Sequence, residues 1–210
     1  MTNNSLEKNT ADSKYSFVKY NYIERWVSFW HQIDEVVKLK PENILEIGPG
    51  NKFITGYLSN LGYDIKTLDI DEDNQPDVVG SVLELPFDDN SFDLILCSEV
   101  LEHLPFDNFM VALEQMRRVA KKYVVLSLPR WGWLFYVKIK LPFLKYKKFY
   151  FKLSGLKKHK IGGRHFWEIG KAGYPLKKIK YLIKEQKFKI IKDYLDPDSP
   201  YHHFFILEKI

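Results

Sequence analysis

The sequence of 210 residues predicts an α/β fold with a parallel sheet at its centre. First, an apolar run at 44–47 stops at Gly-Pro-Gly and is followed by a helical pattern at 51–61, as a buried parallel strand and its helix would be. Second, segments typical of strands and of helices alternate from there to residue 128. Third, two strand-like segments, 188–195 and 201–208, are joined by Asp-Pro-Asp-Ser-Pro and predict a closing hairpin.

The elements follow from apolar spacing in chain order. An aromatic-rich stretch at 15–39 has helical periodicity, and we expect it either to cap a ligand pocket or simply to pack against the core. The strand at 76–79 follows the second strand so closely that little room is left for a helix between them. The expected helices span 15–39, 51–61, 107–120 and 174–186. The expected strands span 44–47, 64–69, 76–79, 92–97, 123–128, 188–195 and 201–208.

Length and composition fit one globular domain, with 45% hydrophobic residues. Residues 1–13 are polar, and no run approaches the length of a membrane span, so we expect a cytoplasmic protein. Cys97 stands in an apolar run, and we expect it to be a buried core residue. We expect a helical segment at 1–40 and a ligand-binding core at 41–129. An insertion at 130–165 and a C-terminal helix with two strands at 166–210 are expected to follow.

Charge is strongly segregated along the chain, although the net charge is only +5. Residues 130–192 hold 19 of the 32 Lys and Arg but only two acids, which gives +17, whereas the remainder carries −12. Such a field indicates an anionic partner such as a nucleic acid, a phosphorylated metabolite or an anionic membrane surface. A lysine-rich, solvated surface is the competing interpretation.

The glycine turn after the first strand predicts a nucleotide-type ligand. Gly48 and Gly50 leave the backbone open, and the next helix presents free N–H groups at its start. A dinucleotide fingerprint would need a glycine where the chain has Phe53. Glu46, two positions before the first glycine, instead suits a ligand that carries positive charge.

The pattern Glu46-x-Gly48-x-Gly50 resembles motif I of the class I S-adenosylmethionine-dependent methyltransferases, in particular small-molecule, type 11-like domains. Lys52 departs from this motif, because the family commonly has a third glycine there. Leu-Pro-Phe at 85–87 and Ser-Glu-Val-Leu-Glu-His-Leu at 98–104 extend the resemblance in the same order. The resemblance implies a Rossmann-like three-layer sandwich whose seven-stranded, mostly parallel sheet has an antiparallel last strand.

The cofactor that the resemblance implies is S-adenosylmethionine. Glu46 would hold its methionine end, which the turn Gly48-Pro49-Gly50 would admit. Asp69 ends the second strand about 20 residues beyond the first glycine, where a carboxylate accepts hydrogen bonds from ribose hydroxyls. Asp71 is the alternative ribose ligand. Around the adenine, the expected residues are Ile70, Ser81 and Val82.

Residues after the fourth strand are expected to face the cofactor or the acceptor, because ligands bind at the carboxyl ends of parallel strands. Ser98 and Glu99 are the expected cofactor contacts. His103, with Glu102, could act as a general base on the acceptor. Alternatively, Glu102 and His103 only begin or cap a helix. We predict no metal site, because the calcium-loop pattern from Asp69 lacks the required glycine and final glutamate.

The insertion at 130–164 interleaves aromatic residues with lysines, eight of them from Lys138 to Lys158. In the resembled family such an insertion commonly builds the acceptor site. Lysines among aromatic residues also suit stacked bases or a membrane interface. Arg164 and His165 are candidate substrate contacts at its end.

We therefore predict an enzyme that moves a methyl group from S-adenosylmethionine to an O, N or C atom of a small-molecule acceptor, for which an anionic compound is one option. An RNA methyltransferase is an alternative, although an Asn-Pro-Pro-Tyr-type motif is absent. A non-catalytic binding or regulatory protein on a degenerate methyltransferase fold is another, supported by Lys52 and Ser81. A nicotinamide-dependent dehydrogenase ranks below both. The sequence makes no prediction of oligomeric state.

Overall fold

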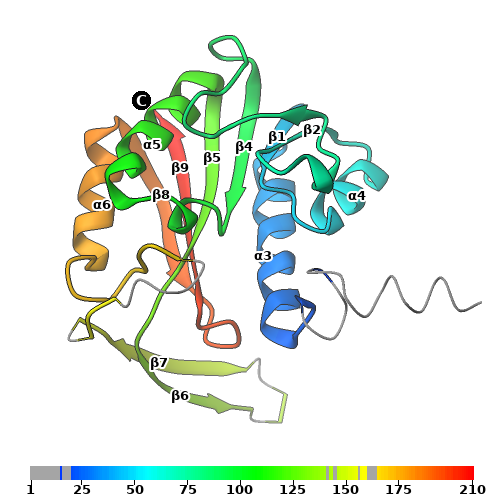
Figure 1. Cartoon of the computed structure of the whole chain (residues 1–210). Helices are drawn as coiled ribbons and strands as arrows, with labels where there is room; N and C mark the ends of the chain where they lie inside the picture. Colours follow the sequence, from blue (N-terminus) through cyan, green and yellow to red (C-terminus); the bar gives the residue numbers. More distant parts are fainter. Residues whose placement is uncertain (1–14, 16–19, 141, 144–145, 156, 160–164) are drawn as a thin grey trace, which may run out of the picture.

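The structure, a computed structural model, describes residues 15, 20–140, 142–143, 146–155, 157–159 and 165–210. Its centre is a seven-stranded sheet in the order β3-β2-β1-β4-β5-β9-β8 (Figure 1). β9 is antiparallel to both of its neighbours, and the other strands are parallel. The predicted mostly parallel sheet with an antiparallel last strand is confirmed. Its strands are β1 Asn43–Ile47, β2 Asp64–Asp69, β3 Val78–Val79, β4 Phe92–Ser98, β5 Ala120–Pro129, β8 Phe188–Leu195 and β9 His202–Lys209.

Helices cover both faces of this sheet. α3 (Ile23–Leu39) and α4 (Phe53–Asn60) lie on one side, and α5 (Phe109–Val119) and α6 (Leu176–Glu185) lie on the other (Figure 1). Each side has its own apolar core. The arrangement is the predicted three-layer sandwich.

β4 shows why the central strands are apolar throughout. Ile95 and Cys97 pack in the core beneath α5 and α6, whereas Leu94 and Leu96 pack in the core beneath α3 and α4. Successive side chains of a strand point to opposite faces, so a strand covered on both sides needs apolar residues at every position. The expected burial of Cys97 is confirmed.

Short 3-10 helices replace longer connections at the carboxyl edge of the sheet. η1 (Glu72–Asn74) joins β2 to β3, as the close spacing of those strands predicted. η2 (Leu101–His103) and η3 (Phe106–Asn108) lie between β4 and α5, so the regular helix starts at Phe109, two residues later than expected. Among the described helices, none is long and apolar enough to cross a membrane.

The insertion after β5 forms a separate two-stranded sheet, which the sequence analysis did not anticipate. β6 (Trp133–Ile139) pairs antiparallel with β7 (Lys147–Leu153) beyond the carboxyl end of β5 (Figure 1). One face contacts the β8–β9 loop, because Tyr136 donates a hydrogen bond to Asp198 over 2.9 Å and Lys148 pairs with the same carboxylate over 2.8 Å. The hairpin is therefore tied to the edge where the predicted site residues lie.

Candidate cofactor and acceptor site

The turn after β1 needs the backbone freedom of glycine. Gly48 has φ +70°, and a Cβ there would lie 2.5 Å from Cγ2 of Val100. Gly50 has φ +57° and also takes the left-handed conformation. Lys52, the departure from the family pattern, has φ +57° too and directs its ammonium to the carbonyl oxygen of Gln75. The position therefore keeps the backbone conformation that glycine favours, at the cost of strain.

Glu46 lies in β1 directly before this turn and is only 5% exposed. Its carboxylate accepts a hydrogen bond from the hydroxyl of Thr55 on α4. Burial raises the pKa of Glu46 to about 7, against a smaller lowering by that bond. A cationic ligand group beside it would stabilise the ionised carboxylate.

One pocket brings together five of the predicted cofactor residues: Glu46, Gly48, Pro49, Ser98 and Glu99. They come from β1, its glycine turn and the end of β4, which pair side by side in the sheet. The opposite wall is α3 and the segment before it. The topology of the sheet thus places these residues around one space at its carboxyl edge.

Tyr20 and Arg25 also line this pocket and were not among the predicted site residues, although both lie in the 15–39 stretch that was expected to cap the pocket or to pack against the core. The Tyr20 hydroxyl lies 3.0 Å from the place where a Cβ on Gly50 would sit, so it covers the glycine turn. The Arg25 guanidinium lies 4.1 Å from the centre of the Tyr20 ring, and its buried Nε has no hydrogen-bond partner among the described residues. A cation in a stretch of aromatic residues was the signal available in the sequence. Arg25 is suited to a ligand carboxylate.

Asp69 ends β2, next to the strand that carries Glu46. Its two oxygens accept hydrogen bonds from the N–H of Asp71 over 2.9 Å and from the amide of Asn74 over 2.8 Å. Asp71 instead caps η1 by accepting from the N–H of Asp73. Asp69 is therefore the better placed of the two predicted ribose ligands, held rigid at the edge of the sheet.

The three residues expected near adenine differ in exposure. Ile70 is 75% exposed. Ser81 accepts a hydrogen bond from the N–H of Leu83 over 3.2 Å, which makes its hydroxyl part of a local turn. Val82 packs within the core beneath α5 and α6 and is 5% exposed. Their contacts with adenine stay predictions, and Ile70 offers the most free surface.

Ser98 and Glu99 close the pocket at the end of β4. The Ser98 hydroxyl is buried and has no hydrogen-bond partner among the described residues. Glu99 accepts a hydrogen bond from the Ser127 hydroxyl over 2.9 Å, and its backbone is held at φ +55°. Burial raises the pKa of Glu99, so without a cationic partner the carboxyl group favours its neutral form.

Glu102 and His103 lie in η2, where Glu102 is fully buried. Its Oε1 is 4.0 Å from Nε2 of His103 and 4.0 Å from Nε2 of His165. Neither Glu102 oxygen has a hydrogen-bond partner within the described part of the chain. The structure thus brings His165 to the two predicted catalytic residues, whereas Arg164 lies outside the described residues.

Comparison with known proteins identifies this core. Residues 45–128 match the family model described as a methyltransferase domain. This segment, 84 of the 210 residues, is therefore similar to methyltransferase domains. The predicted recognition is confirmed, and the matched segment of the methyltransferase domain runs from β1 to β5.

The chain is also similar to individual proteins. An uncharacterized protein of Methanocaldococcus jannaschii is 48% identical over 44 residues, which cover 21% of this chain and 18% of that protein. The magnesium protoporphyrin IX methyltransferase of Synechocystis PCC 6803, solved with bound S-adenosylhomocysteine, has a TM-score of 0.63 at 13% identity and covers 99% of this chain and 94% of its own. The 1,6-didemethyltoxoflavin-N1-methyltransferase of Burkholderia thailandensis was solved with S-adenosylhomocysteine and 1,6-didemethyltoxoflavin. It has a TM-score of 0.58 at 13% identity, and the match covers 100% of this chain and 91% of that protein chain. At these identities the two structures establish the shared fold.

Proposed function

We propose that the protein binds S-adenosylmethionine at the carboxyl edge of its sheet and transfers the methyl group to a small-molecule acceptor. The pocket that joins Glu46, the glycine turn and Glu99 supports this proposal most directly. The two similar methyltransferases were solved with S-adenosylhomocysteine, the demethylated product of this cofactor. The methyl acceptors of those two enzymes do not identify the acceptor of this protein.

The methionine end of the cofactor would lie between Glu46 and Arg25. The ionised Glu46 carboxylate suits the ammonium group, and the Arg25 guanidinium suits the carboxylate, both in a site with little competing water. Gly48 lets the ligand approach the backbone. Tyr20, which covers the glycine turn, would have to move aside or stack on the bound cofactor.

The nucleoside end would extend along the neighbouring strands. Asp69, already oriented by two hydrogen bonds, would accept from the ribose hydroxyls. Ile70, Ser81 and Val82 would border the adenine. This placement runs the cofactor from β4 across β1 to β2, in the order of the strands in the sheet.

The chemistry would be direct displacement. A lone pair of the acceptor atom forms a bond to the methyl carbon while the carbon–sulfur bond breaks, and its electron pair stays on sulfur. Because the sulfonium already activates the methyl group, the protein mainly needs to align the two reactants. Glu102 and His103 are the candidates on the acceptor side, where a proton leaves the acceptor atom.

Transfer from methyl-labelled S-adenosylmethionine to a panel of hydroxylated, aminated and anionic small molecules tests this function. We expect labelled product with at least one compound, and loss of that product in Asp69→Ala. Cofactor binding without transfer to any small molecule would favour the non-catalytic binding protein, and transfer to RNA alone would favour the RNA methyltransferase.

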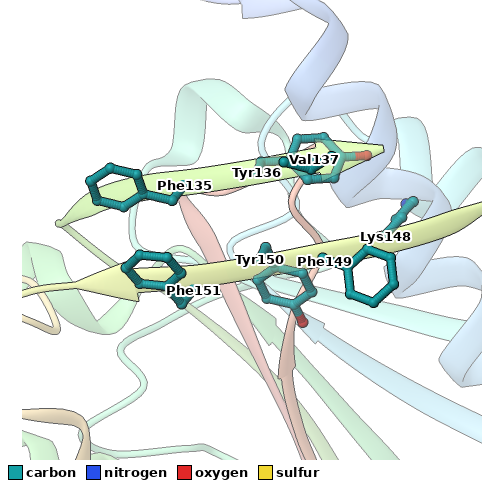
Figure 2. A pocket seen from close by; sticks show the side chains of 7 residues that line it. All are labelled: Phe135, Tyr136, Val137, Lys148, Phe149, Tyr150 and Phe151. Carbon is teal, nitrogen blue, oxygen red and sulfur yellow. The ribbon is translucent and has the colours of Figure 1, made fainter. Parts of the chain in front are cut away.

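A second proposal concerns the β6–β7 hairpin, which we propose docks on an anionic lipid bilayer. Its outward face is apolar, although the inward face that contacts the protein is polar. The opposed pairs Trp133–Leu153, Phe135–Phe151 and Val137–Phe149 share one face, and all six side chains are more than 40% exposed. Figure 2 shows the Phe135 and Phe151 rings next to each other. Their centroids are 4.6 Å apart and the rings are stacked.

Charge favours the membrane over a protein partner. Lys140 and Lys147 are exposed at the end of the hairpin away from β5, within the segment of net charge +17. Aromatic rings that enter the headgroup region beside lysines that meet anionic lipid form a typical interfacial anchor. The hairpin would then hold the acceptor side of the site close to a bilayer.

Vesicle sedimentation tests this docking. We expect binding to phosphatidylcholine vesicles that contain phosphatidylglycerol, weaker binding to phosphatidylcholine alone, and about tenfold or greater loss in Trp133→Ser/Phe149→Ser. Tyr181→Ser is the matched control, because Tyr181 is an exposed aromatic residue on α6. The proposal would be overturned if the double variant and Tyr181→Ser bound the vesicles equally, or if the wild-type protein bound single-stranded RNA but not the vesicles.

A further inference from the structure

A carboxylate and two imidazoles converge beside the cofactor pocket, at Glu102, His103 and His165. One ligand atom from each lies within 4.8 Å of the other two. We infer that these three residues bind a divalent transition-metal ion, and that the ion holds an oxygen atom of the methyl acceptor. The second half of this inference rests on the proposed function, whereas the first half stands independently of it.

The distances fit a metal centre better than a hydrogen-bonded cluster. Glu102 Oε1 is 4.0 Å from each Nε2, which is too long for a hydrogen bond. Ligand atoms at about 2.1 Å from a tetrahedral ion lie about 3.4 Å apart. To close around an ion, the two 4.0 Å separations would shorten by about 0.6 Å, and the widest separation, within 4.8 Å, by up to about 1.4 Å.

The state of Glu102 is the independent sign of a ligand. The residue is 0% exposed, and neither carboxylate oxygen has a hydrogen-bond partner among the described residues. A buried carboxylate without partners is costly in free energy, and in native proteins such groups are normally paired or coordinate a metal. A bound cation would supply the missing partner.

The surroundings of His165 orient its ring toward Glu102. Its Nδ1 is 3.4 Å from Oε1 of Glu168 and 3.1 Å from the hydroxyl of Tyr201. Glu168 is held in turn by Lys171 over 3.0 Å. A carboxylate on the far nitrogen fixes the tautomer of metal-binding histidines and leaves Nε2 for the ion.

The ligand set selects the kind of ion. Two imidazoles and one carboxylate suit Zn²⁺, Co²⁺, Ni²⁺, Mn²⁺ or Fe²⁺, whereas Ca²⁺ and Mg²⁺ prefer oxygen ligands. Three protein ligands also leave coordination positions open. An acceptor hydroxyl or enol bound there would have a lowered pKa, so it could lose its proton to water before its oxygen attacks the methyl group. In this arrangement His103 is a ligand to the ion and not a general base, and the acceptor atom is oxygen.

Cobalt titration of the full-length protein after chelator treatment tests the site. We expect one Co²⁺ per chain with visible absorption bands of an imidazole–carboxylate site. Affinity should fall at least about tenfold in Glu102→Gln and in His165→Asn, and about 10–100-fold in Glu168→Gln. Glu114→Gln, on the exposed side of α5, is the matched control and should bind like the wild type.

Calorimetry with S-adenosylmethionine on the same variants separates the two proposals. Retained cofactor binding in Glu102→Gln, together with lost cobalt binding, is the expected result and also shows that this variant folds. Cobalt binding without cofactor binding would leave the metal site standing and refute the proposed function. Cofactor binding with no cobalt bound by the wild type, or with equal cobalt affinity in Glu102→Gln, would overturn the metal site.

Discussion

The main-chain N–H of Phe166 donates a hydrogen bond to the main-chain oxygen of Glu102 over 2.8 Å. Together with the hydrogen bond from the Trp167 indole N–H to the main-chain oxygen of Leu104 over 3.2 Å, this bond joins the segment after the insertion to the loop after β4. It places His165 beside Glu102, and Trp167 then packs fully buried against Phe106 and Phe109. The acceptor side of the site is therefore assembled from two parts of the chain that are distant in sequence.

Asp69→Ala should weaken binding of S-adenosylmethionine about 10–100-fold, because hydrogen bonds from ribose hydroxyls to a carboxylate are worth roughly 1.5–3 kcal/mol. The melting temperature should change little, since Asp69 is partly exposed and lies outside both cores. Calorimetric titration measures the affinity. Asp64→Ala, an exposed aspartate at the start of the same strand, is the control. Equal affinities for the two variants would rule out Asp69 as the ribose ligand.

Arg25→Gln should weaken binding of S-adenosylmethionine but not of its decarboxylated analogue. The guanidinium is expected to contact only the methionine carboxylate, so the wild type should prefer the intact cofactor by about tenfold or more and the variant should not. The comparison of two ligands on one variant controls for any change in fold. If the preference of the variant equals that of the wild type, Arg25 does not contact the carboxylate.

Cofactor affinity should depend on pH through Glu46. Burial raises its pKa from 4.5 to about 7 in the free protein, so below that pH the group carries a proton that an ammonium ligand must displace. Affinity should therefore rise with pH up to about 7, by at most about tenfold per unit, and Glu46→Gln should remove this dependence. The stability of the free protein should depend on pH in the opposite direction. Between pH 4.5 and about 7 the native state holds a proton on Glu46 that the unfolded state has lost, so the contribution of Glu46 to the free energy of unfolding falls as the pH rises through this range. An unchanged pH profile in Glu46→Gln would contradict this assignment.

Gly48→Ala should destabilise the protein by roughly 1–3 kcal/mol, because the added methyl group would clash with Val100 and the backbone has φ +70°. Gly56→Ala is the matched control. A Cβ there meets nothing within 4 Å, and alanine is the better helix former, so that variant should be as stable as the wild type or more so. Urea unfolding measures both. A Gly48→Ala variant with wild-type stability would show that the turn adapts.

Much of the fold could be predicted from apolar spacing. β2 and β8 have the predicted bounds, and β1 begins one residue before its predicted apolar run, because these runs end at glycine, aspartate or proline signals. The β6–β7 hairpin was missed for a physical reason. Its aromatic face points to solvent and its inward face carries Tyr136, Lys148 and Lys152, the reverse of the pattern by which a packed strand is recognised.

Residues that line the pocket could be predicted where a short motif supplies them, as the glycine-turn motif does for Glu46 and Gly48 and the segment 98–104 does for Glu99. Arg25 could not be singled out, because only the packing of α3 against the carboxyl edge brings it to the pocket. The proposed metal site was not predicted, because Glu102 and His103 have no third ligand nearby in sequence. His165 reaches them through the long insertion, which no local pattern reveals.

Calorimetric titration of the wild-type protein with S-adenosylmethionine and S-adenosylhomocysteine, with NADH as the control ligand, tests the central claim most directly. We predict micromolar binding of the first two at one site per chain and no binding of NADH. Absence of binding for both adenosyl ligands would contradict the account, and it would mean that the Glu46 pocket, closed by Tyr20 and carrying Lys52 in place of glycine, does not accept this cofactor.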